Sequence, residues 1–230
     1  MVQRWPLIFI LSVSLLSIAP LSLAQALLLS PEEHAYVLAH PVIRASNEMD
    51  YPPLDFVIDG QPNGYSIDLL NLLSSKIGFR IRYVNGYTWE QLVALFKQGQ
   101  LDLLHSLAKT PEREQFGRYS MPYRRTPIRY VTRTDMPSFD DVTVLYGKTV
   151  AIGQGWSTQE YLAKYHPQVK LLAVKNSEAM LDAVARGTAD ATVEFGDAAR
   201  YLIKTKGMRN LKLGGWFRAS DRWEAQRFYF

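Results

Sequence analysis

Short apolar segments alternate with helical patterns along most of the chain, and this alternation limits the possible folds more than any other feature. Runs of strand length are followed by segments in which apolar residues recur every three or four positions. Such alternation predicts βαβ units, parallel sheets and therefore an α/β fold. The predicted strands are residues 42–45, 55–58, 80–84, 101–107, 149–152, 169–174, 190–193 and 210–213. The helices between them are predicted to begin at Ser66, Thr88, Ser157 and Ser177.

The same order of elements occurs twice. A helix, a glycine, two further residues, an aspartate and a strand follow one another at Gly99–Asp102 and again at Gly187–Asp190. This repetition predicts two similar α/β lobes joined through the stretch 130–136. Ligands of open α/β sheets bind at the carboxyl ends of the strands, so we expect the binding site in a cleft between the lobes.

Residues 1–24 are predicted to be a targeting segment. Arg4 precedes a long apolar run that Pro20 interrupts, and the small residues Ser22 and Ala24 stand where a signal peptidase reads. We expect cleavage after Ala24. The alternative is an uncleaved anchor, because the apolar residues 27–29 extend the run to a length that can cross a bilayer. Both interpretations predict export.

Composition and missing motifs exclude several classes of protein. The 230 residues include no cysteine, which excludes a disulfide scaffold, a thiolate metal site, a cysteine nucleophile and an N-terminal lipid anchor. The net charge of +4 is too small to indicate nucleic-acid binding, and the basic residues clustered within 118–133 are predicted to form a solvated face. The four histidines lack metal-ligand spacing, and no nucleophile elbow or P-loop occurs. No catalytic residue, metal or cofactor is therefore expected, and the chain is predicted not to be an enzyme.

The segment from Thr110 to Arg113 is the first candidate binding feature. Threonine followed by proline is typical of a helix start, which would place Arg113 in the first helical turn. A cation is unfavourable there because of the helix dipole, so its presence is explained if an anion binds at this position. Arg113 could hold a carboxylate in a two-point fork. The alternative is a surface arginine paired with Glu112 or Glu114.

A second candidate is the glycine-containing loop at residues 153–157, between a predicted strand and a predicted helix. Ser157 and Glu160 have the spacing of a capping box. A glycine loop before a helix N-terminus can hold phosphate or carboxylate. The loop does not match a dinucleotide-binding fingerprint, because Thr158 replaces the third glycine. Trp156 is either a lid over a ligand or part of the core.

Six short motifs follow one another in an order that resembles a known family. They are Glu48-x-x-Tyr51-Pro52-Pro53, Gly64-Tyr65-Ser66-Ile67-Asp68-Leu69, Trp89-x-x-Leu92, Gly99-x-x-Asp102, Thr110-x-x-Arg113 and Ser120-Met121-Pro122-Tyr123. From about residue 42 to 213 the chain resembles the family 3 bacterial extracellular solute-binding proteins, which are periplasmic Venus flytraps. The preceding segment, residues 29–44, is similar to the lead-in of flytrap domains of virulence-type sensor histidine kinases, which have the same fold.

The resemblance implies a set of ligand-binding residues. Arg113, with Thr110 in the same motif, would hold the ligand α-carboxylate; Ser106 and Tyr51 would line the cleft. Glu48 would supply an acidic group in the same loop as Tyr51. The glycine loop of the second lobe would contribute Trp156 and Ser157.

Two departures from the family pattern bear on the ligand. A second serine that the family often carries is Ala108 here. The acid that receives the ligand amine aligns with Phe195, which leaves Glu194 or Asp197 as nearby substitutes. We therefore expect a small anionic or amino-acid-like ligand that bears a carboxylate.

The resemblance also implies the domain organisation. It predicts a type 2 periplasmic-binding-protein fold with parallel and mixed sheets and a central cleft. The expected divisions are a signal peptide at 1–24, a lead-in at 25–41, a first lobe at 42–133, a second lobe at 134–213 and a truncated return crossover at 214–230. On this prediction the chain stops where the return strand should begin, so the C-terminal part of the first lobe is missing.

The predicted function is a periplasmic solute-binding protein without a lipid anchor that captures its ligand by hinge closure. It would serve a membrane transporter. One alternative is the ligand-sensing input domain of a sensor kinase, and another is a dehydratase-like enzyme of the same fold. No nucleic-acid partner is expected.

Overall fold

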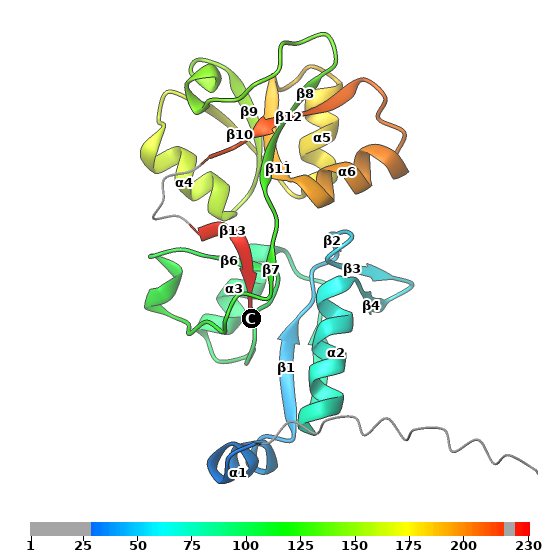
Figure 1. Ribbon diagram of the computed structural model, residues 1–230, viewed down its shortest axis with the longest axis vertical. Helices are drawn as coiled ribbons and strands as arrows, with labels where there is room; N and C mark the ends of the chain where they lie inside the picture. Colours follow the sequence, from blue (N-terminus) through cyan, green and yellow to red (C-terminus); the bar gives the residue numbers. More distant parts are fainter. Residues whose placement is uncertain (1–28, 219–223) are drawn as a thin grey trace, which may run out of the picture.

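Two α/β lobes stacked along the long axis form the molecule (Figure 1). The computed structural model describes residues 29–218 and 224–230, so the predicted signal segment 1–24 lies outside the described residues. The first lobe contains α1 (Pro31–Ala39), β1 (Val42–Ser46), β2 (Asp50–Tyr51), β3 (Asp55–Ile58), β4 (Gln61–Asn63), α2 (Tyr65–Ile77), β5 (Arg80–Val84), α3 (Trp89–Lys97), β6 (Leu107–Lys109), the 3₁₀ helix η1 (Arg113–Gln115), β7 (Arg124–Arg125) and β13 (Glu224–Tyr229). The second lobe contains β8 (Ile128–Arg133), the 3₁₀ helix η2 (Val142–Leu145), β9 (Thr149–Gly153), α4 (Ser157–Tyr165), β10 (Lys170–Val174), α5 (Ser177–Ala185), β11 (Ala191–Phe195), α6 (Gly196–Thr205) and β12 (Leu211–Trp216).

The second lobe is built on one five-stranded sheet with the order β10-β9-β11-β8-β12. Strands β10, β9 and β11 are parallel, while β8 runs antiparallel to both β11 and β12. Val150, Ala151 and Ile152 of the inner strand β9 are completely buried, as expected for a strand covered on both faces. The α/β class and the mixed sheets predicted from the sequence are confirmed.

The first lobe has three small sheets instead of one large sheet. Strands β1 and β5 are parallel, β2-β3-β4 form an antiparallel meander, and β13 lies between β6 and β7. Helix α3 packs its buried Trp89 and Leu92 against Leu104, Leu107 and Tyr229. The start of α3 is fixed by the predicted capping box, in which Thr88 Oγ1 accepts from Gln91 N–H and the Gln91 side chain accepts from Thr88 N–H.

Helix α2 begins one residue before the predicted cap. Its N-cap is Gly64, at φ +121°, and a Cβ at this position would lie 2.4 Å from the carbonyl oxygen of Leu54. Only glycine allows the chain to pass so close to this neighbouring backbone. Ser66 therefore lies inside the first helical turn, where its hydroxyl is free to bond to other parts of the lobe.

The predicted strand 101–107 is wrong. Within it, only Leu103 forms an isolated bridge, to Ala45 of β1, and the strand β6 begins at Leu107. The run is interrupted because Ser106 adopts a left-handed backbone conformation, with φ +58°. This turn separates the bridge at Leu103 from the pairing of β6 with β13.

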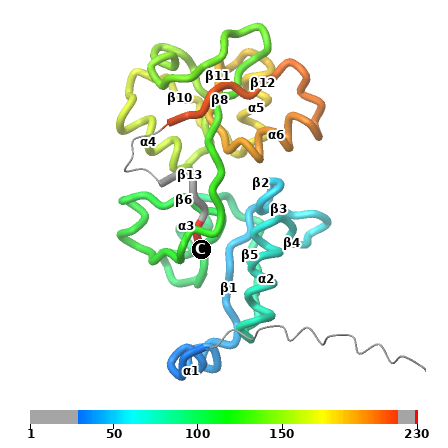
Figure 2. Tube along the Cα trace, in the orientation of Figure 1, coloured from blue at the N-terminus to red at the C-terminus, as the bar shows by residue number. Residues whose placement is uncertain are grey.

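The predicted boundary between the lobes is also corrected. Strand β8 (128–133), placed in the first lobe by the sequence, belongs to the sheet of the second lobe because its partners are β11 and β12. Figure 2 shows the chain crossing from the first lobe to the second between β7 and β8. Helix α6, which the sequence analysis did not anticipate, follows β11 directly.

A return strand is present, contrary to the prediction that the chain stops before it. Strand β13 pairs antiparallel with β6, matching Tyr229 to Leu107, and with β7, matching Phe228 to Arg124. It therefore closes the small sheet of the first lobe. The expectation that this part of the first lobe is missing was wrong for the strand.

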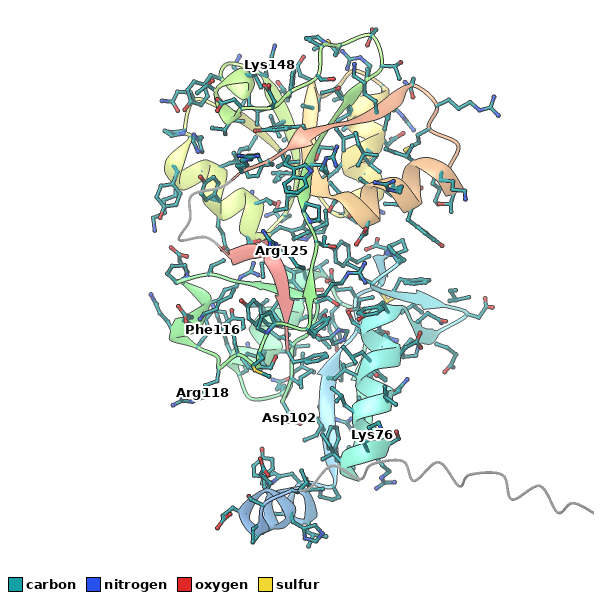
Figure 3. The ribbon with its side chains drawn as sticks, in the orientation of Figure 1. Lys76, Asp102, Phe116, Arg118, Arg125 and Lys148 are labelled. Carbon is teal, nitrogen blue, oxygen red and sulfur yellow. The ribbon has the colours of Figure 1, made fainter. Side chains whose placement is uncertain are left out.

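The basic cluster predicted as a solvated face is divided between structural roles. Figure 3 shows Arg118 on the first lobe and Arg125 near the level where the lobes meet. Arg129 donates to the carbonyl oxygen of Gly214. Arg133 donates to the carbonyl oxygens of Val184 and Ala189. These last two arginines fasten β8 to its neighbours.

Within residues 29–218 and 224–230, no helix has both the length and the apolar character needed to span a bilayer.

Candidate functional site

A cavity lies where the two lobes meet. Its walls come from both lobes and include most of the candidate residues predicted from the sequence. The lining residues are Glu48, Tyr51, Trp89, Ser106, Leu107, Ala108, Arg113, Trp156, Ser157, Thr158 and Phe195. The volume of this cavity is about 30 Å³, room for about two water molecules. A larger ligand therefore enters only when the lobes part or a side chain moves.

Arg113 is the main cation of the cavity wall, and only 6% of it is exposed. Its backbone N–H donates to Thr110 Oγ1 at 3.3 Å, which fixes the turn that precedes η1. The predicted helix start is thus a turn and a short 3₁₀ helix. The guanidinium donates to the carbonyl oxygen of Ala108 at 3.3 Å, and its carbon atom lies 5.4 Å from the ring centroid of Trp89.

The same guanidinium reaches the second lobe. Arg113 Nη2 donates to the carbonyl oxygen of Gly155 at 3.2 Å and to Glu160 Oε1 at 3.4 Å. The surface alternative, in which Arg113 pairs with Glu112 or Glu114, is wrong. Glu112 and Glu114 pair instead with Lys164 and Lys109, each at 2.8 Å.

The aromatic wall is formed from both lobes. Tyr51 of β2 packs edge-on against Trp156 at a centroid distance of 5.5 Å and against Phe195 at 6.3 Å. Trp156 is partly buried and packs against the apolar cores of both lobes. Trp156 lines the cavity from the second lobe and contacts the core of the first, so the core interpretation is confirmed, while its role as a lid over a ligand stays a prediction.

The start of α4, in the glycine loop of residues 153–157, lacks the capping box predicted from the sequence. No side-chain cap bonds the start of α4, and the N–H of Gly155 donates instead to Gln159 Oε1 at 2.7 Å. Gly155 has φ +70°, and a Cβ there would lie 2.6 Å from Cγ of Glu90 in the first lobe. Beyond the loop, Ser157 and Thr158 line the cavity. The buried Thr158 Oγ1 has no hydrogen-bond partner among the described residues, a feature that the sequence did not indicate.

Glu48 supplies the acidic part of the cavity wall. Burial raises its pKa well above the ordinary value, and the nearby Asp55, Asp50 and Glu194 raise it further. The positive charge of Arg113 lowers the pKa of Glu48. A cationic group brought into the cavity would lower this pKa and stabilise the carboxylate.

The two proposed substitutes for the amine-binding acid lie outside the set of lining residues. Glu194 is 1% exposed, accepts hydrogen bonds from Ser177 Oγ at 2.7 Å and Phe195 N at 2.6 Å, and has its pKa raised to about 7 by burial. Burial also acts to raise the pKa of Asp197, but the hydrogen bonds from Thr126 and Arg124 outweigh it and lower the pKa.

Further contacts hold the lobes together around the cavity. They surround the site, so a displacement of the lobes would break several of them at once. They are the hydrogen bond from Asn176 to Asp50, the hydrogen bond from Gln154 to Glu90 and the ion pair between Lys164 and Glu112.

Comparison with known proteins agrees with this architecture. The sequence pattern of the family described as bacterial extracellular solute-binding proteins, family 3, matches residues 43–204. The chain belongs to this family.

Relatives of this family 3 protein include sensors and binding proteins. It is 33% identical over 176 residues to the virulence sensor protein BvgS of Bordetella pertussis, which covers 76% of this chain and 14% of BvgS. It is 29% identical over 178 residues to an L-arginine-binding protein of Pseudomonas aeruginosa, covering 75% of this chain and 68% of the relative. The chain thus spans about one-seventh of the sensor and about two thirds of the binding protein.

Solved structures show the same fold. The crystal structure of a double mutant of the BvgS VFT2 domain matches with a TM-score of 0.75 and 26% identity, covering 87% of this chain and 84% of that chain. An ancestral arginine-binding protein bound to arginine matches with a TM-score of 0.72 and 21% identity over 82% of this chain and 84% of that chain. The predicted type 2 periplasmic-binding-protein fold is confirmed. Among the described residues, no cluster of metal-ligating side chains occurs.

Proposed function

We propose that this chain is a periplasmic solute-binding domain that captures a small molecule bearing a carboxylate and a cationic nitrogen group. The observation that carries the proposal is the position of Arg113. Its guanidinium lies in the cavity wall, is almost completely buried and contacts the second lobe through Gly155 and Glu160. A ligand carboxylate at this point would replace a weak 3.4 Å contact to Glu160 with a two-point charge-assisted pair.

The acidic wall supports the second half of the proposal. Glu48 lines the cavity, and among the described residues that line it Arg113 is the only cation and the others are uncharged. Bringing an isolated anion beside Glu48 would be unfavourable. A ligand with both charges can instead pair its carboxylate with Arg113 and its cationic group with Glu48. An amino acid with a basic side chain has this chemistry, in line with the arginine-binding relatives.

Ligand capture would proceed by movement of the lobes about the crossing between β7 and β8. The contacts that surround the cavity, such as Lys164 to Glu112, join the two lobes, so they would break if the lobes parted. A ligand that touches Arg113 and Ser157 together has contacts in both lobes, so it favours the closed state by its differential affinity.

A thermal-shift screen of amino acids, organic acids and pyridine carboxylates tests this function. A ligand at 100 times its dissociation constant should add about 2.7 kcal/mol of stability. Arg113→Gln should abolish the shift, whereas Arg118→Gln, an exposed arginine of the same lobe, should retain it. Equal calorimetric affinity in the wild type and Arg113→Gln would refute the proposal.

The similarity to BvgS favours a second role, in which ligand capture serves sensing and not uptake. A deletion strain separates the two. Slower growth on the ligand as the nitrogen source indicates uptake through a transporter. Normal growth with altered transcription on addition of the ligand indicates signalling.

A further inference from the structure

Helix α1 packs little against the rest of the chain. None of its nine residues is buried, and Figures 1 and 2 show the helix projecting from the end of the first lobe. Within α1 only Val37 is half-buried, and its other residues are exposed. A helix of this length is not stable alone in water, because it has too few hydrogen bonds to offset the cost of nucleation. A partner that packs against α1 would therefore stabilise it.

The exposed side of α1 carries an apolar stripe. Pro31, Ala35 and Leu38 follow one another at i, i+4 and i+7, a spacing that places them on one face of a helix. All three are exposed, and Leu38 is 69% exposed. Tyr36 flanks this stripe, and Glu32 lies one turn before Tyr36. The helix thus presents an apolar face with an acidic group in its first turn.

The first lobe contains a hollow of about 270 Å³, much larger than the cavity between the lobes. We call it the Phe116 groove. Its walls include the apolar side chains of Phe96, Leu104, Phe116 and Tyr119. Beside Phe116 and Tyr119 it opens into a wider depression of about 750 Å³. Figure 3 shows Phe116 and Arg118, which border the groove, on the first lobe.

The rim of the Phe116 groove has an excess of positive charge. Several charged groups around it pair within the chain; these pairs are Arg44 with Asp102, Lys109 with Glu114 and Arg113 with Glu160. Lys97 and Arg118 are exposed, and the described part of the chain shows no ion pair for either. Lys97 Nζ lies 4.2 Å from the ring centroid of Phe116. The groove therefore complements α1 in both respects, with apolar walls for the stripe and a basic rim for the acidic first turn.

Within one copy α1 does not enter the groove. Its residues are absent from the described lining, and only His40 and Pro41 connect α1 to β1. Pro41 restricts the backbone of both connecting residues. The carbonyl oxygen of Pro41 also accepts a hydrogen bond from the Arg80 N–H at 2.9 Å. These restraints fix the direction in which α1 leaves the lobe, so its apolar stripe can reach the groove of another copy but not its own.

We propose that two copies of this chain form a pair in which the α1 helix of each copy lies in the Phe116 groove of the other. Two identical contacts then close the assembly at two copies, the commonest symmetry of soluble oligomers. Leu38 enters the apolar part of the groove, and Glu32 faces Arg118. The contact lies outside the cavity between the lobes, so it does not depend on which ligand that cavity binds.

Analytical ultracentrifugation tests the pairing. The wild type should change from one copy to two as its concentration rises from about 1 µM to about 100 µM. Leu38→Ser should weaken the pairing at least about tenfold, because each pair loses two apolar contacts. Leu72→Ser, at an exposed leucine of α2, should leave it unchanged. A wild type that remains a single copy at about 100 µM overturns the proposal, as does equal pairing of the wild type and Leu38→Ser.

Two charge reversals test the match between α1 and the rim of the groove. Glu32→Arg and Arg118→Glu should each weaken the pairing at least about tenfold, because both contacts of a pair then bring like charges together. An equimolar mixture of the two variants should pair within about threefold of the wild-type affinity. In such a mixed pair one contact is that of the wild type, and the other has both charges exchanged. Lys76→Glu, at an exposed lysine of α2, should pair like the wild type. A mixture that pairs no better than its components overturns the proposal.

Cross-linking distinguishes exchange between copies from contact within one copy. The chain has no cysteine, so the double variant Leu38→Cys/Gly117→Cys carries only the two introduced thiols. Gly117 borders the groove, and an added Cβ would lie no closer than 3.5 Å to its nearest neighbour, the side chain of Phe96.

Oxidised glutathione should join the two thiols in a disulfide between copies while it is itself reduced. Mass spectrometry of the covalent pairs should then find position 38 of one copy linked to position 117 of the other. A disulfide within one copy, or equal cross-linking in Leu72→Cys/Gly117→Cys, overturns the proposal.

Discussion

Replacing Glu194 with glutamine should change how the stability of the protein depends on pH. The carboxyl group is completely buried, and its pKa is raised from 4.5 to about 7. Between these two pH values the folded protein retains a proton that the unfolded chain releases, so the free energy of unfolding falls as pH rises. At about 1.4 kcal/mol per pH unit, this group alone lowers the stability by about 3 kcal/mol over the interval.

Glutamine at 194 keeps the hydrogen bonds without the charge. Its oxygen can accept from the Phe195 N–H, and its amide can donate to Ser177 Oγ, which now accepts. Glu194→Gln should therefore match the wild type near pH 4 and exceed it by about 3 kcal/mol near pH 8. Urea unfolding from pH 4 to pH 8 measures the difference. Glu32→Gln, on the exposed helix α1, is the control. Parallel curves for Glu194→Gln and the wild type would refute the reasoning.

Three further predictions concern backbone, hinge and core. Gly64→Ala should lower the free energy of unfolding by more than about 2 kcal/mol, because the added Cβ would lie 2.4 Å from a backbone oxygen. Gly60 also has a positive φ but has open space around it, so Gly60→Ala should cost only about 1 kcal/mol. Denaturant unfolding measures both. Asp197→Asn should change the calorimetric ligand affinity less than about twofold, and a tenfold loss would place Asp197 in the site. The same variant should lower the free energy of unfolding by at most about 1 kcal/mol at pH 7. This loss should vanish as the pH falls through the lowered pKa of Asp197. Leu92→Ala, in the core of the first lobe, should lower the free energy of unfolding by about 2–5 kcal/mol. Leu72 is exposed, so Leu72→Ala should lower it by less than about 1 kcal/mol. Similar losses in the two variants would contradict the assigned burial.

The fold could be predicted from the sequence where the signal was local. Apolar periodicity located most of the helices and strands, and the capping box at Thr88 fixed the start of α3. The assignment of β8 to the wrong lobe has a physical reason, because its partners β11 and β12 lie far away in the sequence. The apolar run around Leu103 could not reveal the left-handed turn at Ser106 that ends it.

In the site, too, only the features with a local sequence signal could be predicted. Arg113 was indicated by its unusual place near a helix start and by the resemblance to the family. Its contact with Glu160 joins residues 47 positions apart, and the bond from Ser106 to Ser66 joins residues 40 positions apart. No local pattern encodes such contacts. The capping-box spacing of Ser157 misled, since Gln159 bonds to the loop instead.

The position of the ligand carboxylate tests the central claim most directly. A crystal structure of the protein with the compound that gives the largest thermal shift should show this carboxylate within hydrogen-bond distance of the Arg113 guanidinium, in the cavity lined by Glu48 and Trp156. A carboxylate bound away from Arg113, or a ligand bound outside this cavity, would contradict the account.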